Sequence, residues 1–164
     1  MTKALQKPVV YLETTFVSRL TGWLSPLDHI WAQQVATREW WRLMRARVEA
    51  VVSEVVWFEI ALGDAACAAR RARTIDGLPV WEATPESKAV AKELLRTGAV
   101  NPDKPRDAAH IAVASIGGAD ILLSWNFKDI VNENKLPLVT AVVEGAGFRC
   151  PLITSPDKLL EDLP

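Results

Sequence analysis

The sequence predicts one α/β unit organised around a parallel sheet, and three observations favour it. The run from Pro8 to Leu12 is apolar without polar alternation, which is typical of a strand covered on both faces. Strand-like and helix-like patterns alternate along the chain, and no repeat, low-complexity tract or long linker interrupts them. The 164 residues suffice for a sizeable core, so we expect a single domain over residues 1–164.

Composition excludes several classes of protein. The apolar fraction of 49% and charged fraction of 24% are ordinary for a globular chain. Cys67 and Cys150 lie far apart and outside any Cys/His cluster, which argues against a zinc site or a disulfide framework. Neither a signal peptide nor a membrane span of about 20 apolar residues is recognisable, so a cytoplasmic location is expected. Local clusters of arginine and lysine allow a phosphate-rich partner without demanding one.

The first strand is expected to lead into two helices. Thr14 or Thr15 can cap a short helix that Gly22 ends. A long helix is predicted over residues 28–47, because apolar side chains recur there at helical spacing. Arg38 lies on this apolar stripe, where an arginine more commonly extends from the edge of the core than binds substrate. It is kept as a candidate substrate residue.

The middle of the chain supplies a second strand over residues 50–52 and a helix that Ser53 can cap. Glu59 lies about one turn into this helix, at the border of its apolar face, where an acid needs a partner. The other elements expected here are a helix capped by Asp64, an edge strand over 78–81, and a helix that begins at Thr84-Pro85 and ends at Gly98.

The last third of the chain centres on an alanine-rich helix from about Asp107 to Ser115, whose small side chains imply close packing against the sheet. Asp107 lies in its first turn, where the helix dipole alone would explain an acid. A strand over 119–124 follows, with Asn126 just beyond its carboxyl end. The remaining expected elements are a helix from Pro137 to about Gly145, a strand over 152–154, and a helix starting at Ser155-Pro156.

Four polar side chains can now be gathered: Glu13 and Asn126 each follow an apolar strand, Asp107 heads a buried helix, and Glu59 lies on the helix after the second strand. By itself, Glu13 is explained equally well as an acid that faces water at a strand end. Right-handed crossovers, however, can bring all four groups to one edge of the sheet. Crowded acids need a cation, and oxygen ligands favour Mg²⁺ or Mn²⁺. Such a site suits phosphodiester hydrolysis by a metal-activated water.

Four segments, in this order, resemble the PIN domain, in particular VapC-type toxins of bacterial toxin-antitoxin pairs. They are Tyr11-Leu12-Glu13-Thr14-Thr15, Ser53-Glu54-Val55-Val56-Trp57-Phe58-Glu59, Asp107-Ala108-Ala109-His110-Ile111-Ala112-Val113-Ala114 and Leu122-Leu123-Ser124-Trp125-Asn126-Phe127. The resemblance spans nearly the whole chain. It implies a three-layer α/β/α sandwich with a parallel sheet of four or five strands. It also implies a Mg²⁺- or Mn²⁺-dependent endoribonuclease, commonly dimeric and held inactive by an antitoxin.

The resemblance also assigns roles to individual residues. Glu13, Glu59, Asp107 and Asn126 would be the catalytic and metal-binding set, with Thr14, Thr15, Ser124, Arg38 and His110 as supporting or substrate residues. Glu13 departs from the family, which usually has Asp there. Its additional methylene means that the metal shifts, the side chain folds back or a water intervenes, and Mg²⁺ tolerates such changes poorly. His110 can face the site, although a histidine buried in the core is the commoner case.

Two functional classes stay open: an active ribonuclease toxin that cuts tRNA or another structured RNA, and a catalytically weak PIN-like module that binds RNA or a protein. A phosphatase with an aspartyl nucleophile is less favoured, because Glu13 is followed by threonines. The seven tryptophans also predict a partner. Since adjacent residues lie about 100° apart around a helix, Trp40 and Trp41 cannot both face one core. One must lean outward, which favours a homodimer or an antitoxin groove in this region.

Overall fold

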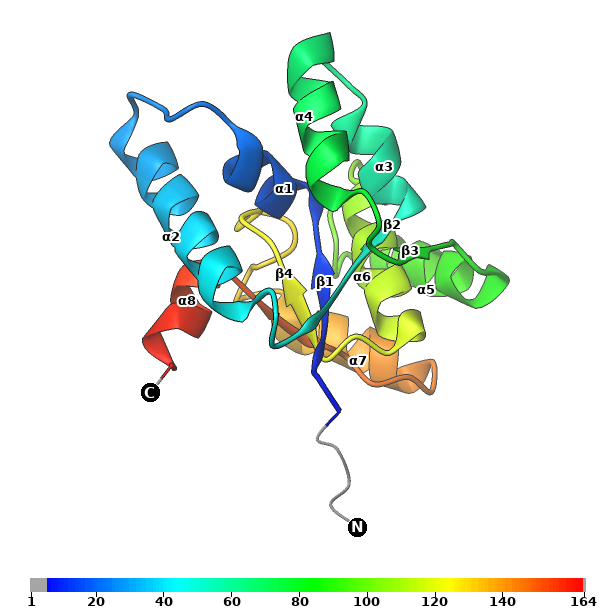
Figure 1. Ribbon diagram of the computed structural model, residues 1–164. Coiled ribbons are helices and arrows are strands. Elements are labelled where there is room, and N and C mark those ends of the chain that lie inside the picture. Colours follow the sequence, from blue (N-terminus) through cyan, green and yellow to red (C-terminus); the bar gives the residue numbers. More distant parts are fainter. Residues whose placement is uncertain (1–5, 164) are drawn as a thin grey trace.

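A computed structural model describes residues 6–163, which form a three-layer α/β/α sandwich (Figure 1). The five strands are all parallel, in the order β3-β2-β1-β4-β5. This confirms the predicted fold class, with the larger of the two expected strand numbers. In chain order the elements are β1 (Val9–Leu12), α1 (Thr14–Thr21), α2 (Asp28–Met44), β2 (Glu49–Ser53), α3 (Glu54–Ile60), α4 (Ala65–Ile75), β3 (Val80–Trp81), α5 (Pro85–Arg96), α6 (Pro105–Gly117), β4 (Ile121–Leu123), α7 (Leu136–Gly145), β5 (Leu152–Thr154) and α8 (Pro156–Glu161).

The central strand is β1, which pairs with β2 on one side and β4 on the other. Val10, Tyr11 and Leu12 are completely buried, as expected of a strand covered on both faces. At one edge, β3 has only two residues, whereas the sequence predicted a strand over 78–81. The difference lies at Pro79, which accepts a hydrogen bond from Val52 N through its carbonyl but has no N–H with which to extend the ladder.

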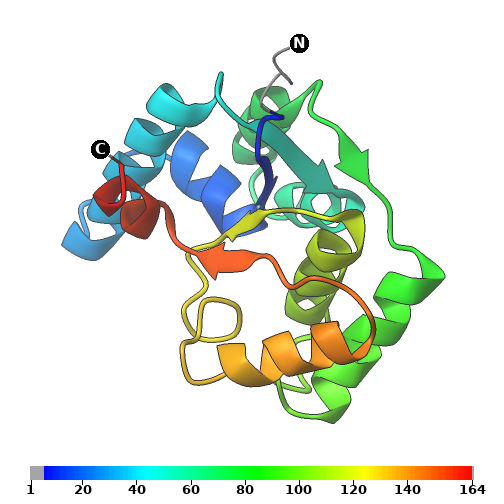
Figure 2. The same cartoon turned by 90° about the horizontal axis from the view of Figure 1, so that it is seen from below.

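Helices cover both faces of the sheet (Figure 2). On one face α1 packs on α2, and α8 packs on α2 as well; on the other, α5 packs on α6 and α7. Ala108, Ala112 and Ala114 of α6 are buried, so this helix lies close to the sheet as predicted. At the far end of α6, a Cβ on Gly117 would lie 2.3 Å from the ring of Trp81, so only glycine allows this approach. The tight packing of α6 fixes the position of its first turn, which carries Asp107.

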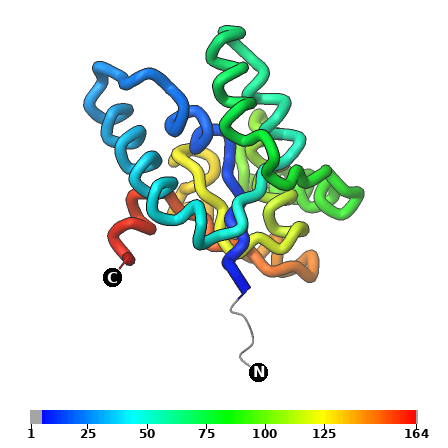
Figure 3. The backbone as a smooth tube through the Cα atoms, viewed as in Figure 1, coloured from blue at the N-terminus to red at the C-terminus, as the bar shows by residue number. Residues whose placement is uncertain are grey.

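Two pairs of helices, α1 with α2 and α3 with α4, stand on either side of the carboxyl end of β1 (Figure 3). Three of the expected N-caps are present: Ser53 accepts from Val56 N, Asp64 from Cys67 N, and Thr84 from Ser87 N. The predicted cap of α1 at Thr14 or Thr15 is wrong. Both threonines are inside the helix, and the N-cap is Glu13.

Tryptophans divide between the core and the surface. Trp40 is buried and Trp41 is half-buried, and both pack edge-on against the Phe16 ring, at centroid distances of 5.5 and 6.0 Å. Trp41 therefore leans outward from the core without becoming a surface residue. The exposed pair is Trp23 at 77% and Trp31 at 49%, in and near the start of α2. Among the helices of residues 6–163, none has the length and apolar character that a membrane crossing requires.

Candidate active site

The carboxyl ends of the central strands open into a polar cleft of about 550 Å³. Glu13 reaches it from the end of β1, Glu59 from α3, and Asp107 from the first turn of α6. Asn126, just after β4, lines the same cleft. The four side chains that the sequence singled out are therefore brought together. The complete lining consists of Glu13, Thr14, Thr15, Glu59, Asp103, Lys104, Pro105, Arg106, Asp107, Asn126, Lys128 and Asp129.

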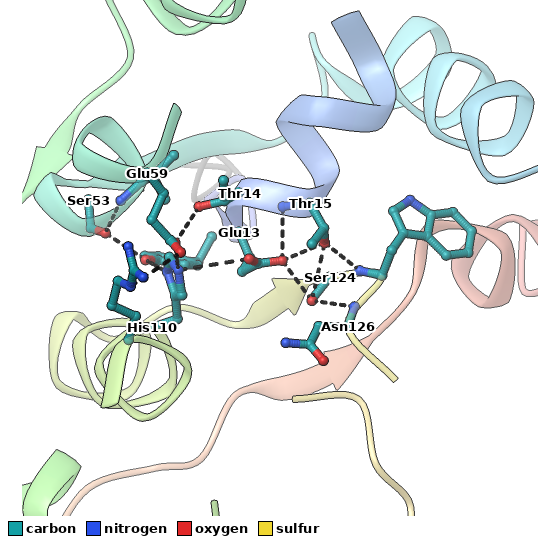
Figure 4. Close-up of polar contacts among 12 residues, drawn as sticks. Glu13, Thr14, Thr15, Ser53, Glu59, His110, Ser124 and Asn126 are labelled. Atoms are coloured by element: carbon teal, nitrogen blue, oxygen red, sulfur yellow. Dashed lines mark hydrogen bonds and ion pairs between the residues drawn. The ribbon is translucent and has the colours of Figure 1, made fainter. Parts of the chain in front are cut away.

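Glu13 is almost completely buried, at 3% exposure, and its carboxylate is held in one orientation (Figure 4). Its Oε2 accepts three hydrogen bonds, from Thr15 N at 3.1 Å, Thr15 Oγ1 at 2.5 Å and Ser124 Oγ at 2.8 Å. The bond from Thr15 N is the helix cap of α1. The additional methylene of Glu13 thus lets the side chain fold back over the first helical turn. Its other oxygen, Oε1, points toward His110 Nε2, 3.8 Å away.

The hydroxyls of Thr15 and Ser124 each join Glu13 to the loop after β4. Thr15 Oγ1 accepts a hydrogen bond from Trp125 N at 2.8 Å, and Ser124 Oγ accepts one from Asn126 N at 2.9 Å. Since each hydroxyl has a single proton, accepting from the backbone leaves that proton for Glu13. The supporting role expected of these two residues agrees with this arrangement, which ties the carboxylate to the position of Asn126.

Glu59 has polar partners on two sides. Its Oε1 accepts from Thr14 Oγ1 at 2.8 Å and from His110 Nε2 at 2.5 Å, and its Oε2 lies 3.9 Å from Arg106 Nε. Burial by itself raises the pKa of Glu59, but the hydrogen bonds from His110 and Thr14 and the nearby positive charge outweigh it. The net effect is a lowered pKa, so Glu59 is ionised at neutral pH.

His110 is completely buried and still bonded to the cleft. Its Nδ1 lies 2.7 Å from the Tyr11 hydroxyl, which in turn lies 2.6 Å from Ser53 Oγ. Because a carboxylate can only accept, His110 carries a proton on Nε2 and donates it to Glu59. Burial strongly raises the pKa of Tyr11, so its hydroxyl stays protonated. His110 is therefore a core residue that also contacts an acid of the cleft.

Asp107 is half-buried and differs from the other acids of the cleft. Burial raises its pKa, and the negative charges of Glu13 and Asp129 raise it further, while His110 and Asn126 act in the opposite direction. The net pKa lies above the usual value of an aspartate. The crowding of acids at the carboxyl ends of the strands thus helps to raise the pKa of Asp107, and a bound cation would offset this repulsion.

Two carboxylates of the cleft and the buried His110 beside them offer three donor atoms that are close enough to share one metal ion. One ligand atom each from Glu13, Glu59 and His110 lies within 4.8 Å of the other two. Donors on an octahedral ion with bonds of about 2.1 Å lie about 3.0 Å apart when adjacent and about 4.2 Å apart when opposite. The residues present therefore fit a divalent metal. Asp107 lines the cleft but does not belong to this tightest group.

Some cleft residues were not singled out by the sequence analysis. Asp129 is buried at the cleft because Asn126 Oδ1 accepts a hydrogen bond from Asp129 N at 3.0 Å, closing a turn after β4. An Asn three residues before an Asp is the signal that could have found it.

Arg38 is not brought to the cleft. Its Nη2 donates to Gly22 O at 2.7 Å, which ties α2 to the end of α1.

No family model and no curated protein matches the sequence. Among solved structures, the chain is similar to VapBC2 from Rickettsia felis, determined bound to a DNA fragment from their promoter. The TM-score is 0.55 at 11% identity, over 90% of this chain and 98% of that one. It is also similar to VapC20 from Mycobacterium tuberculosis, a sarcin-ricin loop cleaving toxin. There the TM-score is 0.45 at 18% identity, over 69% of this chain and 86% of that one. The first similarity confirms the fold that the resemblance to VapC-type PIN domains implies.

Proposed function

We propose that this protein is a metal-dependent endoribonuclease, the toxin of a toxin-antitoxin pair, with tRNA or another structured RNA as its substrate. One observation carries the proposal: Glu13, Glu59, Asp107 and Asn126, which lie far apart in the sequence, line one cleft of a chain with a VapC-like fold. Carboxylates gathered in one cleft can bind a divalent cation, and such a cation can catalyse phosphodiester hydrolysis.

The residues that would hold Mg²⁺ or Mn²⁺ are Glu13, Glu59, Asp107 and Asn126. When bound, the ion polarises the phosphoryl oxygen and makes a water molecule acidic enough to attack phosphorus. The chain contributes orientation. Thr15 and Ser124 fix the Glu13 carboxylate, and Thr14 together with His110 fixes that of Glu59. These partners spare the site a costly reorganisation when substrate enters.

RNA binding is supported by the rim of the cleft. Lys104, Arg106 and Lys128 supply positive charge beside the acids, as contacts to a phosphate backbone require. Phe58 is exposed and lies under Arg106, whose Cζ is 5.6 Å from the centre of the Phe58 ring. An exposed aromatic next to an arginine suits stacking with an unpaired base. We therefore expect the cut strand to be single-stranded at the cleft.

An antitoxin and a second copy of the chain are the proposed protein partners, in the cytoplasm. Trp23, Trp31 and Val35 are exposed on and beside α2, and large exposed aromatics are typical of interface hot spots. The antitoxin proposal also draws on VapBC2, which was determined bound to a DNA fragment from their promoter. Co-expression with the neighbouring reading frame tests the antitoxin. Sedimentation at high micromolar concentration tests the dimer, and a monomer there would reject it.

The alternative is a catalytically weak PIN-like module that binds RNA or protein. Glu13 in place of the family's Asp favours it, because one of the two Glu13 oxygens is already occupied by three hydrogen bonds. The variant Glu13→Asp separates the two proposals. An active enzyme built around Glu13 loses cleavage when the carboxylate is withdrawn by one methylene. A weak module instead gains both Mn²⁺ affinity and cleavage.

The deciding experiment is a nuclease assay of the purified protein on total RNA with Mn²⁺, Mg²⁺ or EDTA. We expect discrete fragments with a divalent ion and none with EDTA. Glu13→Gln, which keeps the shape of the side chain but loses its charge, should give no fragments. Cleavage that persists in EDTA or in the Glu13→Gln variant would contradict the proposal.

A further inference from the structure

We propose that His110 Nε2 is itself a ligand of the metal, together with Glu13 and Glu59, and that the cleft therefore prefers Mn²⁺ to Mg²⁺. This inference rests on the proposed function and names the ion that it uses. It also changes the ligand set, because the carboxylates and amide expected from the sequence resemblance offer only oxygen donors.

The distances carry the inference. His110 Nε2 lies 2.5 Å from Glu59 Oε1 and 3.8 Å from Glu13 Oε1, and the three donor atoms fall within 4.8 Å. The first distance must lengthen by roughly half an ångström for adjacent ligands of one ion, and the second already lies within the range for ligands of one ion. Two of the three residues, Glu13 and His110, are buried and held by several hydrogen bonds. Two of the three donor residues are therefore held in place before an ion arrives.

The surroundings of the second ring nitrogen support ligation. A histidine that binds metal through one nitrogen usually donates the N–H of the other to an oxygen. His110 Nδ1 has such a partner in the Tyr11 hydroxyl, which can itself donate a hydrogen bond to Ser53 Oγ. Donation to Glu59 requires a proton on Nε2, whereas ligation of an ion by Nε2 requires the proton to be on Nδ1, where it would point at Tyr11. Both hydroxyls can donate or accept, so the chain of hydrogen bonds accommodates either tautomer.

The position of His110 on α6 also agrees. Asp107 and His110 are three residues apart, so both lie on the face of α6 that looks toward the carboxyl end of β1. Mn²⁺ binds a given nitrogen- and oxygen-containing site most weakly of the first-row transition ions, but it accepts an imidazole nitrogen better than Mg²⁺, which binds oxygen and keeps several waters. Replacing one oxygen ligand by His110 therefore shifts the preference of the cleft toward Mn²⁺.

The first test measures binding, not cleavage. Mn²⁺ and Mg²⁺ are titrated calorimetrically into the metal-free chain, as wild type and as His110→Gln, whose amide can still donate to Glu59 and accept from Tyr11. We expect wild type to bind Mn²⁺ at least about tenfold more tightly than Mg²⁺. His110→Gln should lose about 10- to 100-fold of the Mn²⁺ affinity and little of the Mg²⁺ affinity. An unchanged ratio of the two affinities would overturn the inference while leaving the proposed function standing.

The second test needs no variant of His110, and so does not depend on how that variant folds. Hyperfine spectroscopy of Mn²⁺ bound to the wild-type chain with ¹⁵N-labelled histidine should show coupling to one imidazole nitrogen. The chain has two histidines, and His29 is exposed in the first turn of α2, so His29→Gln is the matched control and should keep the signal. Bound Mn²⁺ without nitrogen coupling would overturn the ligand assignment. A chain that binds neither ion would overturn the proposed function as well.

Discussion

Asp120 lies at the amino ends of the parallel strands and Asp107 at their carboxyl ends. The electrostatic environments of the two carboxylates are opposite in character. Asp120, just before β4, accepts a hydrogen bond from Val9 N at 2.8 Å and another from Arg149 at 2.9 Å. These two partners lower its pKa. Asp107 lines the cleft at the other edge, where burial and the charges of Glu13 and Asp129 raise its pKa. One carboxylate is satisfied by the chain and the other is not.

The contrast extends to the other charged groups at each end of the strands. Five acids and three cationic side chains line the cleft, so negative charge is in excess there: Glu13, Glu59, Asp103, Asp107 and Asp129 against Lys104, Arg106 and Lys128. At the amino-end edge, Asp120 is paired with Arg149. A carboxylate paired with its own cation, as Asp120 is, serves stability, whereas the acids of the cleft outnumber the cations beside them and favour an ion from outside.

Glu13→Gln should give the largest effect. Because even residues that only support a metal ligand cost 10- to 100-fold, we expect RNA cleavage to fall by more than about 100-fold. The fold should survive, since an amide oxygen still accepts from Thr15 and Ser124. Initial rates of fragment formation measure the loss. The control is Asp120→Ala, at the amino ends of the strands, which should cleave RNA at the wild-type rate per folded molecule. A loss of cleavage in this control as well would contradict the distinction between the two ends of the strands.

Mn²⁺ should stabilise the wild-type protein by mass action. At about 100 times its dissociation constant, an ion that binds only the folded state adds about 2.7 kcal/mol to the free energy of unfolding. A thermal melt with and without millimolar Mn²⁺ measures this. The shift should remain in Asp120→Ala and vanish in Glu13→Gln. A wild-type melting temperature that Mn²⁺ does not move would count against a metal site at the cleft.

Asp120→Ala tests the other half of the comparison. It removes the acceptor of Val9 N, and an amide left without its partner costs about 1–3 kcal/mol. Urea denaturation at pH 7 should show this loss. Since the folded pKa of Asp120 is lowered, the stability that its charge contributes is present at neutral pH and is lost as the pH falls through that value, so the difference between variant and wild type should shrink in acid. A difference that stays constant with pH would reject this account.

Asp107→Asn should stabilise the metal-free protein slightly. Keeping the Asp107 carboxylate ionised destabilises the folded protein, and the amide of asparagine removes that charge. We expect the melting temperature to rise by about 1–3 °C, the size of a change below about 1 kcal/mol. Because the folded pKa is raised, the destabilisation by Asp107 develops as the pH rises from the unfolded pKa through the folded one. The gain should therefore be present at pH 7 and absent below pH 3.

Arg106→Ala should have the smallest effect and should act on substrate, not on the metal. Losing one phosphate contact weakens RNA binding similarly for all sequences and lowers the slope of log affinity against log salt by roughly one unit. Filter binding with the inactive Glu13→Gln background measures the slope. Arg96 is the matched control, since it is exposed and paired with Glu93 away from the cleft. An equal change of the salt slope in Arg96→Ala would mean that the net charge of the protein, and not the rim of the cleft, determines RNA binding.

Short-range physics let the sequence determine most of the fold. The strands of residues 9–12, 49–53 and 152–154 follow from apolar runs bounded by polar residues. The caps at Ser53, Asp64 and Thr84 follow from side chains that bond the backbone three residues on. Glu13 and Asp107 could be found in the same way, because Glu13 follows a predicted strand and Asp107 heads a predicted helix, whereas Glu59 was found by its place at the border of an apolar helix face.

Only the tertiary structure decided how the side chains of the cleft combine. The bond from His110 to Glu59 spans 51 residues and that from Ser124 to Glu13 spans 111, so no local pattern encodes either. Glu13 folds back over α1, and Arg38 bonds to the end of α1. Both contacts depend on which neighbour each long side chain meets after packing. The sequence by itself determined which elements carry the polar groups. The packing of α3 and α6 against β1 determined that a histidine lies between two of the acids, because side-chain direction is set by neighbours from distant parts of the chain.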